Sequence, residues 1–235
     1  MSQTIESWKA NAKEWIHIVH TNSIPSRAIT NPAIMATVLQ SCHGKSVLDL
    51  GCGEGWLCRA LQKEGLRTFG IDGTWDLIEA AKKQGLSDSF ECLSFEEIIA
   101  WSKKKITYPL LDQLANQPFD GLIFNFCLYG DVDSEALLRA VQPLVRQDGK
   151  VYIQTLHPLA MLAMGLRYES QWMADAWKGL PGNFTNGHPW YARTLQDWML
   201  LFRNSGFQLQ QLLEPQGKEL NQPSSIIFVL SSLPK

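Results

Sequence analysis

The chain lacks long apolar segments, paired cysteines and an excess of charge of either sign. No apolar run approaches the ~20 residues that a membrane-spanning helix needs, and the polar start at residues 1–6 lacks a signal peptide's apolar core. The 5 cysteines include no Cys-x-x-Cys pair, and their odd number argues against a disulfide framework. These absences predict a cytoplasmic protein with no membrane segment and no bound metal.

The charge balance is nearly neutral, with 21 Lys and Arg against 23 Asp and Glu and a formal net charge of −2. Such a surface exerts no general attraction on nucleic acid or on anionic membranes. We therefore expect no nucleic-acid partner. The oligomeric state stays open, because Trp8 and Trp15 are compatible with packing on the core and with packing on a second chain.

The N-terminal segment has the pattern of a helical cap. Five apolar residues recur there at helical spacing and predict an amphipathic helix: Ile5, Trp8, Ala12, Trp15 and Val19. Asn31 followed by Pro32 predicts the start of a second helix that extends to about Cys42. Residues 1–43 are thus expected to cap a domain formed by residues 44–235.

From residue 46 onward, strand and helix patterns alternate. The expected strands span residues 46–51, 67–72, 90–93, 119–126, 151–155, 207–213 and 225–230. The expected helices span residues 56–63, 74–84 and 134–145, with two more opening at capping signals, Ser94 to Glu97 and Thr194 to Asp197, the last helix closing at Gly206. Repeated strand–helix units predict an α/β fold with a doubly wound, Rossmann-like, mostly parallel sheet, and the last two strands are expected to pair as an antiparallel hairpin.

The stretch "VLDLGCGEGW", residues 47–56, is a strand that ends in three closely spaced glycines. Gly51 and Gly53 remove side chains so that backbone can contact a ligand, and Gly55 lets the next helix pack closely. Asp72 lies about 20 residues further on, where a carboxylate can accept hydrogen bonds from ribose hydroxyls. Because ligands of doubly wound sheets bind beyond the carboxyl ends of the strands, this turn is the predicted ligand site.

Two kinds of ligand are candidates for binding at the turn. A dinucleotide site would have Gly-x-Gly-x-x-Gly with a pyrophosphate at the helix N-terminus. This chain has Gly-x-Gly-x-Gly preceded by Asp49, whose charge repels a pyrophosphate and suits a ligand with an ammonium group. An NAD(P)-dependent oxidoreductase is therefore the weaker alternative, and a tight turn without any ligand is the purely structural one.

At these residues the sequence resembles the class I S-adenosylmethionine-dependent methyltransferases. "VLDLGCGEGWLCRAL" and "GIDGTWDLIEAA" are similar to their first two motifs, and "FDGLIFNFCLYG" and "GKVYIQTLHP" to their fourth and fifth strand segments. The resemblance runs from about residue 46 to the C-terminus. It implies a seven-stranded sheet of order 3-2-1-4-5-7-6 with strand 7 antiparallel, S-adenosyl-L-methionine as cofactor and S-adenosyl-L-homocysteine as its product.

The resemblance also implies which residues contact the cofactor. Asp49 is placed near its amino group, and Asp72 is placed on its ribose. The other implied cofactor residues are Gly51, Cys52 and Gly53 in the turn, Gly73 and Thr74 after the second strand, Ser94 and Phe95 beside the adenine, and Asn125 and Phe126 under the reacting centre. Arg27 is a candidate for the cofactor carboxylate, with an ordinary surface arginine as the alternative.

The absence of certain family motifs narrows the range of methyl acceptors that we expect. Asn125 is not followed by the Pro-Pro-aromatic sequence of base amino-methylating members, nor by the paired glutamates of arginine-directed members. The metal-binding Asp-Asn pair of catechol-type members is also absent, since Leu156, His157 and Pro158 stand in its place. These differences favour a small-molecule substrate.

Candidate residues for the acceptor lie after the fourth and fifth strands. His157 is either a general base, because histidine titrates near neutral pH, or a residue that shapes the strand end; Tyr129 is a second candidate. Residues 159–192 lose the alternation and are rich in Trp, Tyr and Met, which fits either an apolar substrate lid or a satellite core. Four residues in and beside this insertion are candidates for binding the methyl acceptor: Trp172, Trp190, Tyr191 and Arg193. The alternative is that they only anchor the loop.

The sequence therefore predicts a methyltransferase that acts on a small, aromatic or apolar molecule by O- or C-methylation. The alternative from another class is a non-catalytic S-adenosylmethionine-binding sensor or partner subunit.

Overall fold

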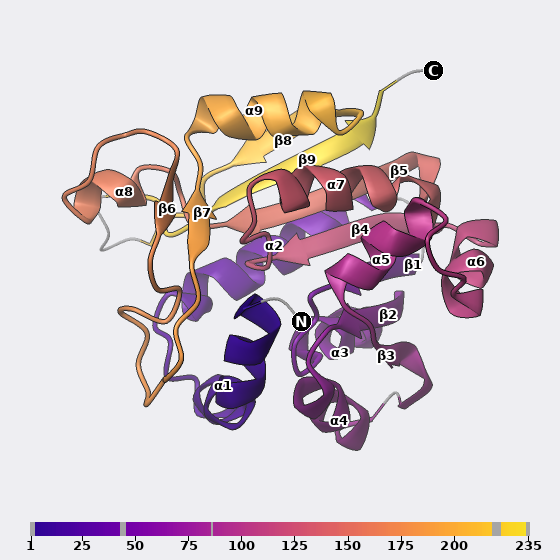
Figure 1. Ribbon diagram of the computed structural model, residues 1–235, viewed down its shortest axis with the longest axis horizontal. Coiled ribbons are helices and arrows are strands. Elements are labelled where there is room, and N and C mark those ends of the chain that lie inside the picture. The colour runs from indigo at the N-terminus through magenta and orange to yellow at the C-terminus, as the bar shows by residue number, and fades with distance from the viewer. Residues whose placement is uncertain (1–2, 43–45, 86, 218–221, 234–235) are drawn as a thin grey trace.

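The computed structural model describes residues 3–42, 46–85, 87–217 and 222–233. Within these ranges, seven strands form one sheet with helices on both of its faces (Figure 1). The strands of this sheet are β1 Ser46–Leu50, β2 Arg67–Asp72, β3 Phe90–Cys92, β4 Phe119–Asn125, β5 Val145–Thr155, β8 Phe207–Leu213 and β9 Ile226–Ser232. The longer helices are α1 Gln3–His20, α2 Arg27–Ser41, α3 Trp56–Lys63, α4 Trp75–Lys83, α5 Phe95–Ser102, α6 Pro109–Asn116, α7 Val132–Ala140 and α9 Leu195–Asn204.

The sheet has the order β3-β2-β1-β4-β5-β9-β8. Strands β3, β2, β1, β4 and β5 pair in parallel, whereas β9 is antiparallel to both β5 and β8. Because β8 and β9 are the sixth and seventh strands of this sheet along the chain, the expected order 3-2-1-4-5-7-6 with an antiparallel strand 7 is confirmed. The strand order reverses between β1 and β4, and ligands of doubly wound sheets bind at the carboxyl ends of the strands beside such a reversal.

The core has two halves, one on each face of the sheet. All five residues of β1 are buried, as expected for a parallel strand that helices cover on both sides. Leu48 and Leu50 pack in the half that includes residues of α5, α7 and α9, whereas Val47 packs with Ile34 of α2 and Leu57 of α3. This period-two alternation is what holds the sheet between its two helical layers.

The second helix begins earlier than the sequence pattern indicated. The expected start at Asn31–Pro32 was wrong, because α2 begins at Arg27 and contains Pro32 in its interior. Proline removes one intrahelical hydrogen bond. The buried face formed by Thr30, Ile34 and Val38 against the sheet compensates for this loss, since most helix stability comes from tertiary packing.

Two further differences concern the segment around β4. Helix α6 was not anticipated; Pro109 stands at its first position, where a missing N–H costs little. The helix expected over residues 134–145 ends at Ala140, because Pro143 cannot continue it. Strand β5 consequently starts at Val145, where it pairs with Phe119 before a register shift.

The insertion between β5 and α9 contains a short helix, α8 Ala160–Ala163, and a two-stranded ribbon formed by β6 Gln171–Met173 and β7 Trp190–Ala192. In Figure 1 this insertion (orange) and α1 (indigo) lie side by side at the end of the sheet toward which β4 and β5 point. Both segments are therefore placed at the predicted ligand site. Among the described residues, no helix has the length and apolarity needed to cross a membrane.

Candidate functional site

The glycine turn connects β1 to α3 in a left-handed backbone conformation. Gly51, Gly53 and Gly55 have φ angles of +78°, +58° and +80°, a region that favours glycine. A β-carbon on Gly51 would lie 2.6 Å from Cβ of Cys127, and one on Gly55 would lie 2.6 Å from the ring of Phe90. Gly55 thus allows close packing of α3, as expected, and Gly51 allows the turn to approach the segment after β4.

Asp49 is a buried carboxylate that accepts a single hydrogen bond from the described residues. It is 2% exposed, and its Oδ2 accepts only a weak hydrogen bond from the Cys58 thiol at 3.8 Å. Its Oδ1 has no partner among the described residues. Burial, together with the charges of Asp72 and Glu54, raises the pKa of Asp49 to about 7, and the hydrogen bond from Cys58 opposes the shift. A cationic group beside Asp49 would relieve both effects.

Asp72 ties the second strand to the glycine turn. Its Oδ2 accepts a hydrogen bond from the N–H of Gly53 at 3.0 Å, and its Oδ1 accepts one from the N–H of Thr74 at 2.8 Å. Burial raises the pKa of Asp72, and these two backbone donors oppose the shift. Each carboxylate oxygen keeps a second lone pair, so the group can still accept hydrogen bonds from a ligand.

The residues after β3 adjoin the same turn. Ser94 caps α5 in a reciprocal capping box with Glu97, which confirms the expected helix start. A β-carbon on Gly73 would lie 3.3 Å from Cα of Ser94, and one on Gly51 would lie 3.4 Å from the ring of Phe95. The predicted residues that follow β1, β2 and β3 are therefore brought together at one edge of the sheet.

The end of β4 completes this edge. Asn125 has a buried Oδ1 with no hydrogen-bond partner in the described part of the chain. Phe126 has a φ of +54°, which is strained for an aromatic residue, and its N–H donates to the carbonyl of Gln154 at 2.8 Å. Cys127, which the sequence analysis did not single out, donates from Sγ to the Leu50 carbonyl at 3.0 Å.

Helix α1 covers the turn. The indole nitrogen of Trp15 lies 3.7 Å from where a β-carbon on Gly53 would stand, and Ile5 approaches Gly73 in the same way at 2.6 Å. Both residues were expected to lie on the apolar face of the first helix. In the structure, this face packs on the edge of the sheet. The ring of Trp15 therefore packs on its own chain, next to the glycine turn.

A group of rings, here called the aromatic cluster, joins α1 to the segment after β4 and to the insertion. It consists of Trp8, Trp15, Tyr129, Trp177, Phe184 and His188. The ring centroids of Trp8 and Trp177 are 4.6 Å apart, and those of Tyr129 and His188 are 4.9 Å apart. The high aromatic content of the insertion was visible in the sequence, but the convergence of these particular rings was not.

Three sets of hydrogen bonds fasten α1 to the insertion. The indole N–H of Trp177 donates to Oγ of Ser7 at 2.8 Å. Asn11 bonds to both backbone polar groups of Thr185, and Oε1 of Glu14 accepts from the N–H of Asn183 at 2.8 Å. Helix α1 and the insertion therefore form one covering layer over the site.

The residues predicted to bind the acceptor in and beside the insertion lie mainly on the β6–β7 ribbon. Trp172 is 56% exposed and makes an edge contact with Tyr191, with ring centroids 5.2 Å apart. Arg193 is buried and donates from Nη2 to the carbonyls of Gly130 and Asp131 at 2.7 and 2.9 Å. These contacts anchor the insertion to the loop after β4. A role of Trp172, Trp190, Tyr191 and Arg193 in acceptor binding stays a prediction.

His157 lies at the end of β5 with both ring nitrogens engaged. Its Nδ1 accepts a hydrogen bond from the N–H of Leu159 at 3.1 Å, so Nε2 is the atom that donates to Glu214 at 2.8 Å. Glu214 follows β8, and the pair connects the ends of two strands. Because neither nitrogen has a free lone pair in this arrangement, we assign no proton transfer to His157.

Tyr129 and Arg27, the remaining candidates, have different surroundings. Burial raises the pKa of Tyr129, and the charge of Asp72 raises it further, so the phenol stays protonated near neutral pH. Arg27 is half-buried, with its guanidinium over the ring of Trp56 at 5.1 Å. Burial lowers the pKa of Arg27, and the Glu54 carboxylate partly restores it.

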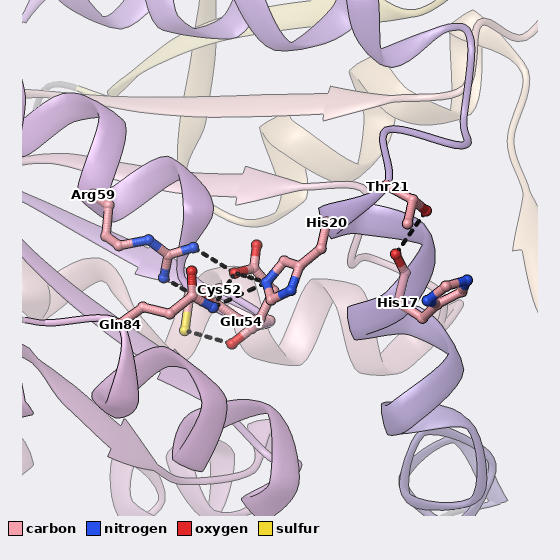
Figure 2. Close-up of polar contacts among 8 residues, drawn as sticks. His17, His20, Thr21, Cys52, Glu54, Arg59 and Gln84 are labelled. Atoms are coloured by element: carbon pink, nitrogen blue, oxygen red, sulfur yellow. Dashed lines mark hydrogen bonds and ion pairs between the residues drawn. The ribbon is translucent and has the colours of Figure 1, made fainter.

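A second polar group beside the turn was not anticipated (Figure 2). The Glu54 side chain is 1% exposed and pairs with Arg59 at 2.5 Å, while Gln84 donates to it at 3.4 Å. His20, at the end of α1, lies 3.8 Å from the same carboxylate oxygen and 3.0 Å from the amide of Gln84. This group links α1, α3 and α4 around the glycine turn.

Comparisons with known proteins agree with this geometry. A family model described as a methyltransferase domain matches residues 10–212. The ubiquinone biosynthesis O-methyltransferase of Salmonella paratyphi A is 28% identical over 114 residues, which cover 48% of this chain and 43% of that protein. The protein of the same name from Histophilus somni is 26% identical over 177 residues, covering 71% of this chain and 70% of the relative. The chain thus aligns with less than half of the first relative's length.

The fold also matches solved structures. The 1,6-didemethyltoxoflavin-N1-methyltransferase of Burkholderia thailandensis, solved with 1,6-didemethyltoxoflavin and S-adenosylhomocysteine, superposes with a TM-score of 0.65. The two are 15% identical, and the match covers 96% of this chain and 88% of that chain. The family match spans most of the chain and the sheet order is that of the class. The chain therefore belongs to the methyltransferase domain family, as a class I S-adenosylmethionine-dependent methyltransferase.

Proposed function

We propose that this chain binds S-adenosyl-L-methionine across the glycine turn and transfers its methyl group to a small aromatic or apolar molecule. The observation that carries the cofactor assignment is the buried Oδ1 of Asp49, which precedes the glycine turn and has no hydrogen-bond partner within the described ranges. A buried carboxylate without a partner is costly, and an ammonium group would pair with it. The amino acid portion of S-adenosylmethionine supplies such a group.

The donor set fits the rest of the cofactor as well. Asp72 would accept hydrogen bonds from the ribose hydroxyls, with Gly73 and Thr74 beside it. Ser94 and Phe95 would border the adenine, and Asn125 and Phe126 would lie near the sulfonium. Cys52 would contribute its backbone and fill the turn, and Arg27 is kept as a candidate for the carboxylate.

The cofactor, when bound, supplies an electrophilic methyl group. The chain's own task is to orient the acceptor in line with that methyl and to keep water away. The layer formed by α1 and the insertion is suited to this task, because Trp15 of α1 lies next to the turn and its ring is part of the aromatic cluster. We accordingly propose residues 159–192, together with the cap of residues 1–43, as the lid of the active site.

The choice of a small acceptor is supported by two further observations. The curated relatives are named as O-methyltransferases of ubiquinone biosynthesis, and the Burkholderia neighbour is named for N-methylation of a small heterocycle. The aromatic cluster offers flat apolar surfaces with few polar groups, which is typical of a small-molecule pocket. We propose O-methylation as the first activity to test and C-methylation as the second.

The decisive experiment is thermal unfolding with S-adenosylmethionine, S-adenosylhomocysteine and NADH. A ligand at 100 times its Kd should add about 2.7 kcal/mol of stability. We expect stabilisation by the two sulfur ligands, a weaker effect in Asp72→Ala, and an undiminished effect in the control Asp76→Ala, an exposed carboxylate on α4. Stabilisation by NADH alone would contradict the proposal, as would no stabilisation by any of the three.

A second measurement separates an enzyme with an acceptor from a protein that only binds the cofactor. Radiolabelled methyl from S-adenosylmethionine would be followed into the small-molecule fraction and into the macromolecular fraction of a cell extract. We expect label in the small-molecule fraction. Label confined to protein or nucleic acid would contradict the proposed substrate class.

A further inference from the structure

His188 is a fully buried histidine with one unused nitrogen. The side chain is 0% exposed, and its Nδ1 lies 3.0 Å from the carbonyl oxygen of Pro189. A carbonyl can only accept, so Nδ1 carries the proton and Nε2 carries the lone pair. This Nε2 has no hydrogen-bond partner among the described residues. Buried polar atoms of native proteins are nearly always paired. We therefore expect a bound molecule to supply the hydrogen bond that Nε2 lacks.

The surroundings of His188 are rings and one carboxylate. Tyr129 and Trp177 make edge contacts with the imidazole, with centroids 4.9 and 5.6 Å away. The carboxylate of Asp175 accepts a hydrogen bond at Oδ1 from the N–H of Trp177 at 2.9 Å, and its charge acts on the imidazole. Within this neighbourhood, Nε2 of His188 is a buried acceptor without a partner among the described residues, and it is placed among rings that could hold a flat molecule.

The cluster is also close to the predicted reacting centre. Tyr129 stands four positions after Asn125, and the charge of Asp72 acts on its phenol. Trp8, which packs on Trp177, is on the same helix as Trp15, whose indole nitrogen reaches the glycine turn. A flat molecule held against these rings would therefore lie next to the cofactor.

We propose that His188 recognises the methyl acceptor, by accepting a hydrogen bond at Nε2 from a hydroxyl or ring N–H of a flat aromatic molecule. This inference rests on the proposed function. It transfers the role that the sequence suggested for His157 to a histidine whose lone pair has no partner in the described part of the chain. Burial lowers the pKa of His188, which keeps the imidazole neutral and able to accept.

If the acceptor is a hydroxyl group, the same hydrogen bond provides a route for the proton that the hydroxyl loses. The acceptor oxygen forms a bond to the methyl carbon as the carbon–sulfur bond breaks, and that electron pair stays on sulfur. The O–H bond breaks and its proton goes to Nε2 of His188, which later releases it to solvent. The products are the methyl ether, S-adenosylhomocysteine and one proton, so atoms and charge balance.

The test uses the full chain saturated with S-adenosylhomocysteine and two probes, 2-naphthol and 2-methoxynaphthalene. The two share a ring system, and only the first has a hydroxyl donor. In the wild type we expect 2-naphthol to bind roughly 3- to 10-fold more tightly, as one net hydrogen bond would give. Nitrogen-15 NMR of labelled histidines should show 2-naphthol, and not the ether, shifting Nε2 of His188.

Two variants complete the test. His188→Phe keeps a ring and removes the lone pair, so the preference for 2-naphthol should fall to about 1-fold. His188→Gln keeps an oxygen acceptor and should recover part of the preference. Should His188→Phe not fold, the glutamine variant and the wild-type NMR signal still decide.

The possible outcomes separate the inference from the proposed function. Failure of S-adenosylhomocysteine to bind the wild type would overturn the proposed function and this inference together. Normal S-adenosylhomocysteine binding with equal affinity for the two probes, or with binding of neither, would overturn the inference alone. A proton found on Nε2 instead of Nδ1 in the unliganded protein would also overturn it.

Discussion

The side chain of Asn11 in α1 pairs with the backbone of Thr185 in the insertion. Nδ2 donates to the Thr185 carbonyl at 2.6 Å, and Oδ1 accepts from the Thr185 N–H at 2.8 Å. Asn11 is 2% exposed, so these bonds are shielded from water. One polar side chain thus joins the two segments that we propose as the lid.

Asn11→Ala should lower the free energy of unfolding by roughly 1–3 kcal/mol, because it leaves backbone groups of Thr185 without partners. Urea denaturation would measure the change. Asn204→Ala removes an exposed asparagine from the end of α9 and should cost about 0.5 kcal/mol or less. Equal costs for the two variants would show that the Asn11 contact does not hold the lid.

Gly51 and Gly165 form a matched pair for testing the glycine turn. Their φ angles are +78° and +75°, but among the described residues only Gly51 has an atom in the way of a β-carbon, namely Cβ of Cys127 at 2.6 Å. Gly165→Ala should cost roughly 1–2 kcal/mol of backbone strain. Gly51→Ala should cost roughly 1–3 kcal/mol more, through overpacking, and should weaken S-adenosylhomocysteine binding. Similar unfolding midpoints would contradict the close approach.

The raised pKa of Asp49 predicts a pH dependence. Its pKa rises from 3.8 to about 7 on folding, so the folded state binds the proton more tightly than the unfolded chain. Stability from this group is therefore greatest below about pH 4 and falls as the pH rises to about 7, by up to about 4 kcal/mol. Asp49→Asn should remove this slope, which unfolding experiments from pH 5 to pH 8 would measure.

The same carboxylate predicts the pH dependence of ligand affinity. An ammonium group beside Asp49 favours its ionised form, so S-adenosylhomocysteine should bind more tightly as the pH rises from 6 to 8. Calorimetric titration would show this rise in the wild type and a flat profile in Asp49→Asn. A rise that persists in the variant would assign the effect to another group.

The Glu54–Arg59 pair should behave as a buried ion pair. Glu54 is 1% and Arg59 is 19% exposed in the side chain, against 35% for Glu135 and 57% for Arg139 in the helical pair of α7. Arg59→Met should cost roughly 3 kcal/mol, because it leaves the buried Glu54 carboxylate without its cation. Arg139→Met should cost less than about 1 kcal/mol. Comparable values from urea denaturation would mean that solvent reaches Glu54.

Much of the fold could be predicted because it depends on short-range patterns. Strands β2 and β8 and helix α3 have the bounds expected from their alternation and capping residues. The start of α2 was missed, because the local signal of Asn31 and Pro32 was outweighed by burial of the helix against the sheet. Here tertiary packing overrode a local preference.

The convergence of the predicted cofactor residues could also be predicted from the sequence. Asp49, Asp72 and Asn125 stand at or beside the carboxyl ends of parallel strands, and such ends share one edge of the sheet. Their convergence therefore follows from strand order alone. The acceptor side was less accessible. His157 stands at the correct strand end, yet Leu159 and Glu214 occupy both of its nitrogens.

The α/β class, the glycine turn and the strand-end carboxylates follow from the order of amino acids alone, because side-chain periodicity and turn chemistry act over a few residues. The contact between Trp8 and Trp177, and the lack of a partner for Nε2 of His188 among the described residues, depend instead on the tertiary structure. The first joins segments of the chain that are more than 160 positions apart. The second depends on how a long insertion folds back. Such contacts arise from the packing of the whole chain, which no local pattern encodes.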